Sequence, residues 1–257
     1  MCNLRPLQFI MSYYIPLAII FTIFSLILYI TINYLNKKKY NFSNLLGNKN
    51  ISIIVAHPDD ELMFFFPTIK FLFDKKKKKN IFLLCLSNGN YYGYGNIREQ
   101  ELYKVWSYIG GEKNNCHIWN DNKIQDGWLY WDEKYIFKLI KDYCIQYDIK
   151  TIFTFDNYGV SGHPNHISAY KSIRMLSHMK DIDIYTLKST NIIYKYMSFF
   201  SYPFITNKRY VIWSFNPLLL LRLMFFYKSQ LVYYRILFCI FSQYVYFNTF
   251  DLLKTYK

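Results

Sequence analysis

The sequence predicts an α/β domain built as a three-layer sandwich, in which a mostly parallel sheet lies between two layers of helices. After residue 50, short apolar runs alternate with longer amphipathic segments, which is the pattern of strand–helix–strand units. The chain has 257 residues, of which 53% are hydrophobic, and it contains few glycines and prolines. This composition supports one sizeable core and excludes a disordered or fibrous chain.

Strands and helices are expected to alternate through this domain. Apolar runs typical of buried strands occupy residues 51–55, 81–86, 151–155 and 183–187. Amphipathic segments typical of helices occupy residues 61–73, 96–109, 132–147 and 164–178. Gly110 and Gly111 close the second of these helices. The order of elements predicts a Rossmann-like sandwich, whose ligands collect beyond the carboxyl ends of the strands.

An uncharged apolar stretch precedes the domain. Residues 7–36 contain no charged residue and no histidine, and they exceed the ~20 residues that cross a bilayer. Residues 1–36 are therefore predicted to be a membrane anchor with one transmembrane helix. A signal peptide is the alternative, but no small-residue cleavage site follows the apolar part. Arg5 precedes the stretch and lysines 37–39 follow it, so the positive-inside rule places the rest of the chain in the cytosol.

The rest of the chain divides into three parts. Residues 37–50 are a basic linker, residues 51–195 the α/β domain, and residues 196–257 an apolar extension. Two strongly apolar runs in the extension, residues 218–226 and 236–247, are each shorter than a membrane span. They are expected to be helices that complete the domain or contact the membrane, and a second span is the alternative.

The net charge indicates which partners the protein can bind, and the spacing of the cysteines indicates its redox compartment. The formal net charge is +14, and two lysine runs, residues 37–39 and 75–79, make this basicity partly local. Such runs suit an anionic membrane surface or a solvated loop, and no motif for reading DNA or RNA accompanies them, so no nucleic acid partner is expected. The five cysteines are scattered and never form a C-x-x-C pair. A disulfide framework is therefore not indicated, and a reducing compartment fits best.

Two loops at predicted strand ends carry the chemistry. AHPDDE, residues 56–61, follows the first strand, and GHPNH, residues 162–166, follows the third. Because both loops lie at carboxyl ends of strands, they are expected to face one crevice. His57, Asp60 and His166 can supply two imidazoles and one carboxylate to a divalent metal. Capping of the following helices is the alternative for each loop alone, but a His-Pro pair in both favours the metal site.

These motifs resemble those of the zinc-dependent de-N-acetylases of the LmbE-like superfamily, and within it the branch that acts on N-acetylglucosaminyl-phosphatidylinositol. The resemblance runs from about residue 51 to residue 252 and includes the segments AHPDDE, LLCLSNGNYYGYG, REQEL, TFDNYGVSGHPNH and KSQL. It implies hydrolysis of the N-acetyl group of this lipid to glucosaminyl-phosphatidylinositol and acetate, the second step of GPI-anchor biosynthesis. It also implies a divalent metal, with Zn²⁺ the first expectation, and a place in the endoplasmic reticulum membrane.

The resemblance implies a role for each matching residue. His57, Asp60 and His166 hold the metal, and Asp59 is the general base. His163, in its protonated form, stabilises the oxyanion and helps the amine to leave. These roles agree with the chemistry of metal-assisted amide hydrolysis.

Two positions depart from the wider family pattern. Asn165 stands where many relatives have aspartate, and Ser161 stands where some soluble bacterial relatives have tyrosine. Neither is an expected ligand. An asparagine raises the pKa of a neighbouring histidine less than a carboxylate does, so this change bears on the charge and orientation of His163.

Substrate contacts are expected from the second strand's loop and the helix after it. The Arg98 guanidinium is a candidate for the substrate's phosphate or inositol, and a surface ion pair with Glu99 or Glu101 is the alternative. Ser87 and Asn88 are candidates for sugar hydroxyls, or they only turn the chain.

Two other functions remain open at this point. One is de-N-acetylation of another N-acetylglucosamine compound, and the other is a non-catalytic membrane scaffold that keeps the fold. Retention of all five expected metal and catalytic residues argues against the scaffold.

Overall fold

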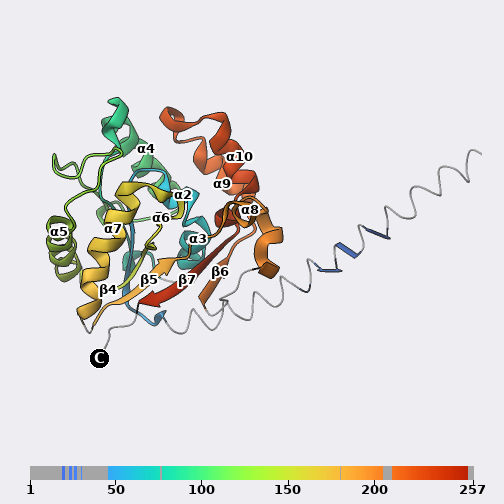
Figure 1. The fold of residues 1–257 in the computed structure, drawn as a ribbon, viewed down its shortest axis with the longest axis horizontal. Helices are drawn as coiled ribbons and strands as arrows, with labels where there is room; N and C mark the ends of the chain where they lie inside the picture. Colours follow the sequence, from blue (N-terminus) through green and yellow to red (C-terminus); the bar gives the residue numbers. More distant parts are fainter. Residues whose placement is uncertain are drawn as a thin grey trace, which may run out of the picture.

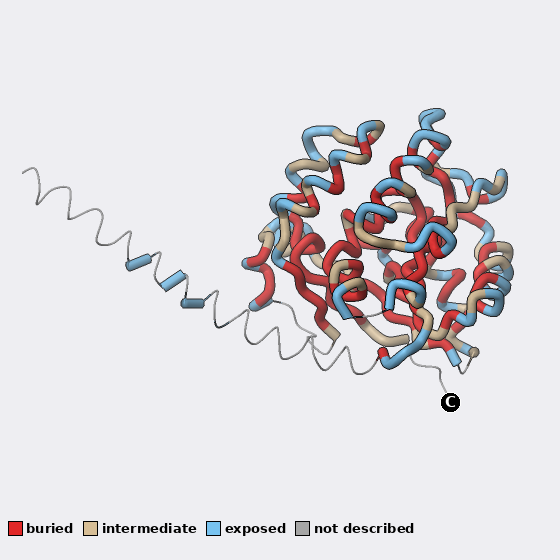
Figure 2. The backbone as a smooth tube through the Cα atoms, turned by 180° about the vertical axis from the view of Figure 1, so that it is seen from behind, coloured by how far each residue is buried: buried red, intermediate tan, exposed pale blue. Residues whose placement is uncertain are grey.

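A computed structural model of the chain describes residues 46–75, 77–179, 181–204 and 210–253, together with 19–20, 23–24, 26–27 and 30. Its architecture is a three-layer α/β sandwich with a mostly parallel sheet, which confirms the predicted fold class (Figure 1). The strands are the most deeply buried part of the domain (Figure 2). They are buried on both faces, which explains why the sequence shows continuous apolar runs rather than alternation.

The sheet has the strand order β3-β2-β1-β4-β5-β7-β6. The strands are β1 (Asn50–Val55), β2 (Ile81–Cys85), β3 (Cys116–Ile118), β4 (Ile149–Phe155), β5 (Asp183–Leu187), β6 (Tyr210–Trp213) and β7 (Phe247–Leu253). Strands β1 to β5 pair in parallel, and β7 is antiparallel to both of its neighbours, β5 and β6. The strand order reverses between β1 and β4, and the loops that follow these two strands lie where α/β sheets of this kind bind their ligands.

The helices cover both faces of this sheet. The α-helices are α2 (Asp60–Met63), α3 (Phe66–Lys75), α4 (Gly95–Tyr108), α5 (Glu133–Gln146), α6 (Gly159–Gly162), α7 (Pro164–Arg174), α8 (Ile192–Lys195), α9 (Pro217–Met224) and α10 (Tyr233–Phe241). The 3₁₀ helices are η1 (Lys78–Asn80), η2 (Asn90–Tyr92), η3 (Lys113–Asn115), η4 (Met175–His178), η5 (Ser198–Phe204), η6 (Lys228–Gln230) and η7 (Gln243–Val245). Helices α5 and α7 pack together against β4, and α3 and α4 cover the other face, as right-handed crossovers require (Figure 1).

All four predicted strands are present. Two of the predicted helices are interrupted or change to a 3₁₀ helix within their predicted ranges. The helix expected over residues 61–73 is interrupted after Met63 and restarts at Phe66, because Pro67 fits only the first turn of a helix. The helix expected over residues 164–178 tightens into a 3₁₀ turn at Met175. Strand β3 was not predicted, since three residues are too few to show a pattern.

The apolar extension completes the domain, because β6 and β7 belong to the same sheet as the strands before them. Helix α9 matches the first predicted run. The prediction of a helix over residues 236–247 is wrong beyond Phe241, where Ser242 starts a new turn by accepting a hydrogen bond from the Tyr244 N–H. The chain then enters β7, whose first residues are as apolar as the helix before them.

The membrane prediction concerns a part of the chain that is mostly outside the described residues. The expected span, residues 7–36, is described only at a few scattered positions, and residues 37–45 of the linker are not described. Among the residues that are described, we find no helix with both the length and the apolar character needed to cross a bilayer. The anchor therefore remains a prediction.

Asn248 ties the last strand to the helices that carry the first motif. This fully buried side chain accepts hydrogen bonds through Oδ1 from the Thr68 hydroxyl (2.7 Å) and the Thr68 N–H (3.3 Å). Its Nδ2 donates to the carbonyls of Phe64 (2.7 Å) and Tyr244 (3.2 Å). The Thr68 N–H belongs to the first turn of α3 and has no partner within the helix, so Asn248 serves as its cap.

We predict that Asn248→Ala destabilises the domain by ~3 kcal/mol, because several buried polar groups lose a hydrogen-bond partner. Urea unfolding followed by tryptophan fluorescence measures the change. Asn122→Ala, at an exposed loop position, is the matched control and should leave the midpoint unchanged. Equal midpoints for the two variants would contradict this role for Asn248.

Candidate metal and catalytic site

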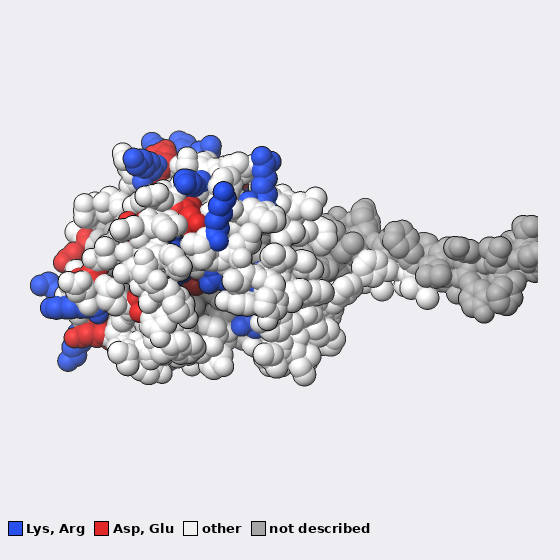
Figure 3. Space-filling model, turned by 90° about the horizontal axis from the view of Figure 1, so that it is seen from above, with Lys and Arg blue, Asp and Glu red and all other residues white. Residues whose placement is uncertain are grey.

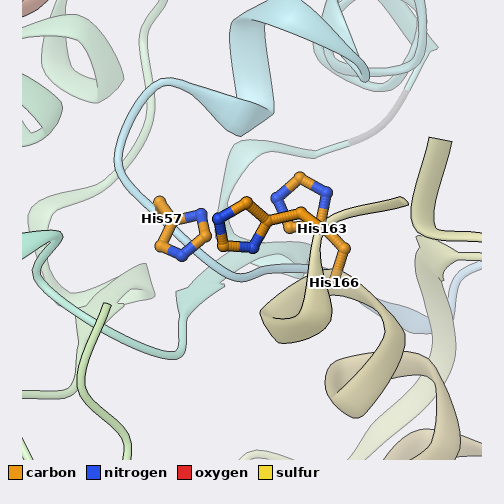
Figure 4. A group of neighbouring side chains, drawn as sticks. All are labelled: His57, His163 and His166. Carbon is orange, nitrogen blue, oxygen red and sulfur yellow. The ribbon is translucent and has the colours of Figure 1, made fainter. Parts of the chain in front are cut away.

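Three histidines meet where the strand order reverses. His57 follows β1, and His163 and His166 lie at the start of α7, which follows β4. Their rings come from two segments far apart in the sequence and point toward one another (Figure 4). One ring nitrogen from each lies within 4.8 Å of the others, which makes the group a candidate metal site.

Asp60 sits between two of these histidines. Its Oδ2 lies 3.5 Å from Nδ1 of His57 and 3.3 Å from Nε2 of His166. The same oxygen accepts hydrogen bonds from the N–H groups of Ala56 (3.2 Å) and His57 (2.8 Å), which fix the carboxylate in place. Two ligands at ~2.0–2.1 Å from a tetrahedral ion lie ~3.3–3.5 Å apart, so these spacings suit a shared metal. The structure thus brings together the predicted ligands His57, Asp60 and His166.

The hydrogen bonds of His57 orient its ring for this purpose. Its Nε2 lies 2.9 Å from Oδ1 of Asn165 and 3.1 Å from Oδ1 of Asp126. Because both neighbours are acceptors, Nε2 carries the proton and the lone pair of a neutral ring lies on Nδ1, the nitrogen that faces Asp60. Acceptors of this kind commonly fix the tautomer of a metal-binding histidine.

His166 is oriented in the same way from the other loop. Its Nδ1 donates to the carbonyl of Gly159 (3.0 Å), which leaves the Nε2 lone pair facing Asp60. Its ring stacks on Phe155 at a centroid distance of 4.1 Å. Gly159 has φ +66°, and a Cβ there would lie 2.7 Å from the Cβ of His166. Only glycine therefore allows the loop to approach the histidine this closely.

His163 differs from the other two histidines. Its Nδ1 accepts a hydrogen bond from the Asn165 N–H (3.2 Å), so Nε2 of the neutral ring carries a proton and presents no lone pair. Burial, together with the positive charges of His57 and His166, lowers the pKa of His163 to about 4. The expectation of a protonated His163 is therefore corrected: the ring is neutral at pH 7 and offers an N–H donor.

His57 and Asp60 stabilise each other's charged forms. Burial disfavours the imidazolium form of His57, but hydrogen bonds and charge from Asp126 and Asp60 outweigh it and raise the pKa of His57 to about 10. Burial also opposes ionisation of Asp60, yet His166 and His57 hold the pKa of that carboxyl well below its usual range. A protonated His57 and an ionised Asp60 form an ion pair at neutral pH. A metal ion that binds here replaces the proton.

Asp59 is held in an unusual backbone conformation. Its φ of 104° is rare for a residue other than glycine and costs ~1–3 kcal/mol, a strain typical of functional sites. Its Oδ2 lies 2.7 Å from Nη1 of Arg235 and its Oδ1 3.6 Å from Nη2 of Arg98. Burial outweighs these two cations and raises the pKa of Asp59. A carboxyl group with a raised pKa is a better proton acceptor near neutral pH.

Glu61 holds the backbone of Asp59 through a hydrogen bond. Its Oε2 accepts the Asp59 N–H (3.0 Å), and its Oε1 accepts the Tyr227 hydroxyl (2.6 Å). Burial raises the pKa of this fully buried carboxyl to about 8. Glu61 therefore acts on the site through the backbone of Asp59.

The expected substrate residue Arg98 has its partners inside the protein. It is buried, and its Nη1 donates to the Gly89 carbonyl (2.8 Å) and pairs with Asp126 (3.2 Å), while its Nη2 donates to the Pro58 carbonyl (2.8 Å). Both terminal nitrogens are thus engaged inside the protein, which leaves no paired donors for a phosphate. The alternative, a surface ion pair with Glu99 or Glu101, is not formed either.

Ser87 and Asn88 also bond internally. The Ser87 hydroxyl donates to the Ala56 carbonyl (3.0 Å), and Nδ2 of Asn88 donates to Glu99 (3.0 Å). Both residues are buried, so they shape the loop beside the motif AHPDDE rather than meet a sugar directly.

Three residues make contacts at the site that the sequence did not indicate, although Asn165 stands out as a departure from the family pattern. Asp126 pairs with both His57 and Arg98, Asn165 bonds to His57, and Arg235 pairs with Asp59. Asp126 lies in the loop after β3. Its position after a parallel strand could have indicated it, because the loops at the carboxyl ends of such strands supply ligand-binding residues. Arg235 lies on α10 in the extension, and no local pattern links it to the site.

Comparison with known proteins agrees with this geometry. The family model described as "PIG-L: GlcNAc-PI de-N-acetylase" matches residues 52–176, which include all the expected metal and catalytic residues. A Schizosaccharomyces pombe protein named "Probable N-acetylglucosaminyl-phosphatidylinositol de-N-acetylase" is 41% identical over 156 residues, which are 60% of this chain and 62% of that protein. The match to the Bos taurus N-acetylglucosaminyl-phosphatidylinositol de-N-acetylase is 32% over 80% of this chain and 85% of that protein.

The solved structures support the fold. N,N'-diacetylchitobiose deacetylase from Pyrococcus horikoshii superposes with a TM-score of 0.55 at 13% identity, over 80% of this chain and 85% of that one. At this identity the likeness concerns the fold alone. Because the match to the Bos taurus protein spans 85% of that relative at 32% identity, the chain belongs to the PIG-L family of N-acetylglucosaminyl-phosphatidylinositol de-N-acetylases.

Proposed function

We propose that the chain hydrolyses the N-acetyl group of N-acetylglucosaminyl-phosphatidylinositol to give glucosaminyl-phosphatidylinositol and acetate, the second step of GPI-anchor biosynthesis. The observation that carries the proposal is the position of the Asp60 carboxylate between His57 and His166, in a chain of this family. The donor set of two imidazoles and one carboxylate fits a divalent metal with open positions, and Zn²⁺ is the first choice by ligand type.

The residues around the site have separate roles in this reaction. When bound, a divalent ion would lower the pKa of a water molecule and polarise the acetamide carbonyl. The Asp59 carboxylate accepts a proton from the attacking water, and Arg235 and Arg98 hold that carboxylate in position. The neutral His163 donates a hydrogen bond from Nε2 to the carbonyl oxygen as negative charge develops there. The proton taken by Asp59 is then passed to the departing amine.

We place the protein in the endoplasmic reticulum membrane with the catalytic domain facing the cytosol. The uncharged residues 7–36, followed by lysines 37–39, support this orientation. The four described cysteines are free and buried, in keeping with a reducing compartment. A lipid substrate fits a tethered domain, because its head group reaches the crevice without leaving the bilayer.

Acetate release from N-acetylglucosaminyl-phosphatidylinositol in mixed micelles tests the proposal. We expect turnover that a chelator abolishes and that Zn²⁺ restores. N,N'-diacetylchitobiose is the soluble comparison, and turnover of this sugar without turnover of the lipid would assign the chain to a different substrate.

The metal content of purified variants distinguishes the proposed ligands from the neighbouring His163. We predict that Asp60→Ala and His166→Ala lose the ion, whereas His163→Ala retains it and loses activity, because His163 presents a proton rather than a lone pair. Elemental analysis of the purified variants measures this. The exposed His178→Ala is the control and should keep both metal and activity. Retention of metal by Asp60→Ala, with loss in His163→Ala, would assign the ion to the three histidines instead.

Asp59 is predicted to accept the proton of the attacking water and to take no part in metal binding. Asp59→Asn should keep the metal and lower kcat by ~10²- to 10⁴-fold, the usual range for loss of a general base. Steady-state kinetics together with metal analysis checks this prediction. Wild-type kcat in this variant would remove Asp59 from the mechanism.

Metal uptake is predicted to depend on pH through His57. Its pKa is about 10 in the protein without metal, so the ring is protonated at pH 7 and must lose that proton to bind an ion. Binding should therefore release about one proton per ion and tighten about tenfold for each pH unit between pH 6 and 8. Calorimetry in buffers of different ionisation enthalpy measures the release. A value near zero would show that His57 is not a ligand.

A further inference from the structure

Helix α10 is apolar on its outer side as well as its inner side. Tyr233, Leu237 and Phe241 are 77%, 48% and 49% exposed, and they lie on one face of the helix. Arg235 is the only charged residue of α10. A surface helix normally turns polar residues to water, and one that is apolar all round is buried in protein or contacts lipid.

The inner side of α10 reaches the catalytic site. Phe238 and Cys239 are buried in the core, and Arg235 points inward to pair with Asp59 at 2.7 Å. Helix α10 therefore lies between Asp59 and whatever covers its outer side. The thickness of one helix, ~10–12 Å, separates the two.

The apolar surface continues onto the neighbouring elements. Ile192 and Ile193 of α8 are 72% and 69% exposed, and Tyr196 places its ring 6.3 Å from that of Phe238, which links α8 to α10. Phe200 of η5 is also exposed, and its ring lies 5.5 Å from that of Phe24, in the uncharged N-terminal stretch. We call the exposed residues of these elements the apolar face, which comprises Ile192, Ile193, Phe200, Tyr233, Leu237 and Phe241.

Basic residues outnumber acidic ones in this part of the sequence. From residue 184 to residue 250 it contains seven lysines and arginines and no aspartate or glutamate. A groove of about 980 Å³ between α4 and the α9–η6 segment is lined by three basic residues, Lys104, Arg222 and Lys228, and by one acidic residue, Glu101. Seen from above, charged side chains are sparse over the right-hand part of the domain (Figure 3). An apolar surface with a basic border matches a membrane of anionic phospholipids.

We infer that the apolar face docks into the interfacial layer of a phospholipid bilayer, with α10 lying along the membrane surface and Arg235 directed away from it into the catalytic site. Continuity with the uncharged N-terminal stretch favours lipid over a protein partner as the occupant. The inference rests on the proposed function, because it adds how a lipid substrate reaches the site. It assigns the extension a role in substrate access in addition to completing the sheet.

A fluorescent probe tests the docking directly. The full-length chain with Cys2→Ser and Leu237→Cys, labelled with an environment-sensitive dye, is reconstituted into vesicles of phosphatidylcholine with phosphatidylinositol. The other cysteines are buried and will resist labelling. We expect a blue shift, and quenching by brominated lipids. The same label at Ile145→Cys, which is 63% exposed on α5 at the far side of the domain, is the matched control and should show neither effect (Figure 1).

Kinetics provide a second, independent test. Leu237→Asp should raise KM for the lipid substrate in vesicles about tenfold or more, since a buried leucine contributes roughly that factor to binding. Turnover of a water-soluble glycan analogue should stay the same, and Ile145→Asp should behave as wild type on both substrates.

Two outcomes would overturn the inference. Unquenched label at position 237 in vesicles would show that lipid does not cover the face. A blue shift that needs no lipid and grows with protein concentration would assign the face to a second copy of the chain. Neither result would affect the proposed reaction, which fails only if the wild-type enzyme releases no acetate from the lipid.

Discussion

The contact between the Asp60 carboxylate and the imidazoles of His57 and His166 is the interaction on which the site depends. It joins the loop after β1 to the loop after β4, so it exists only because the strand order reverses between these two strands. Each imidazole is oriented by an acceptor on its far nitrogen, and both acceptors, Asn165 and the Gly159 carbonyl, lie in the segment that follows β4. The two backbone N–H groups that hold Asp60 complete a site whose geometry is set before any ion binds.

The C-terminal extension is part of this site as well as part of the fold. Tyr227 donates to Glu61, Gln230 donates to the Pro58 carbonyl, and Arg235 pairs with Asp59. These three contacts hold Pro58, Asp59 and Glu61 of the AHPDDE turn against the extension. Helix α10 of the same extension carries part of the apolar face, so it links the surface that we assign to lipid with the carboxylate that we assign to proton transfer.

Much of the fold was predictable because parallel strands buried on both faces leave continuous apolar runs. The ligands were predictable for a related reason: His57, Asp60 and His166 lie in local motifs at strand ends, where topology brings them together. Residues that act across the fold were not predictable. Arg235 is distant in sequence from Asp59 and stands in an apolar segment without a motif, and the engagement of Arg98 by Gly89 and Pro58 depends on loop shape. The lowered pKa of His163 follows mainly from burial, which no sequence pattern records.

X-ray absorption at the metal edge of the zinc-loaded protein tests the central claim most directly. The account predicts two imidazole nitrogens and oxygen ligands at ~2.0–2.2 Å, with no sulfur, and one imidazole fewer in His166→Ala if any ion remains. A first shell of three imidazoles, or one that is unchanged in His166→Ala, would contradict it.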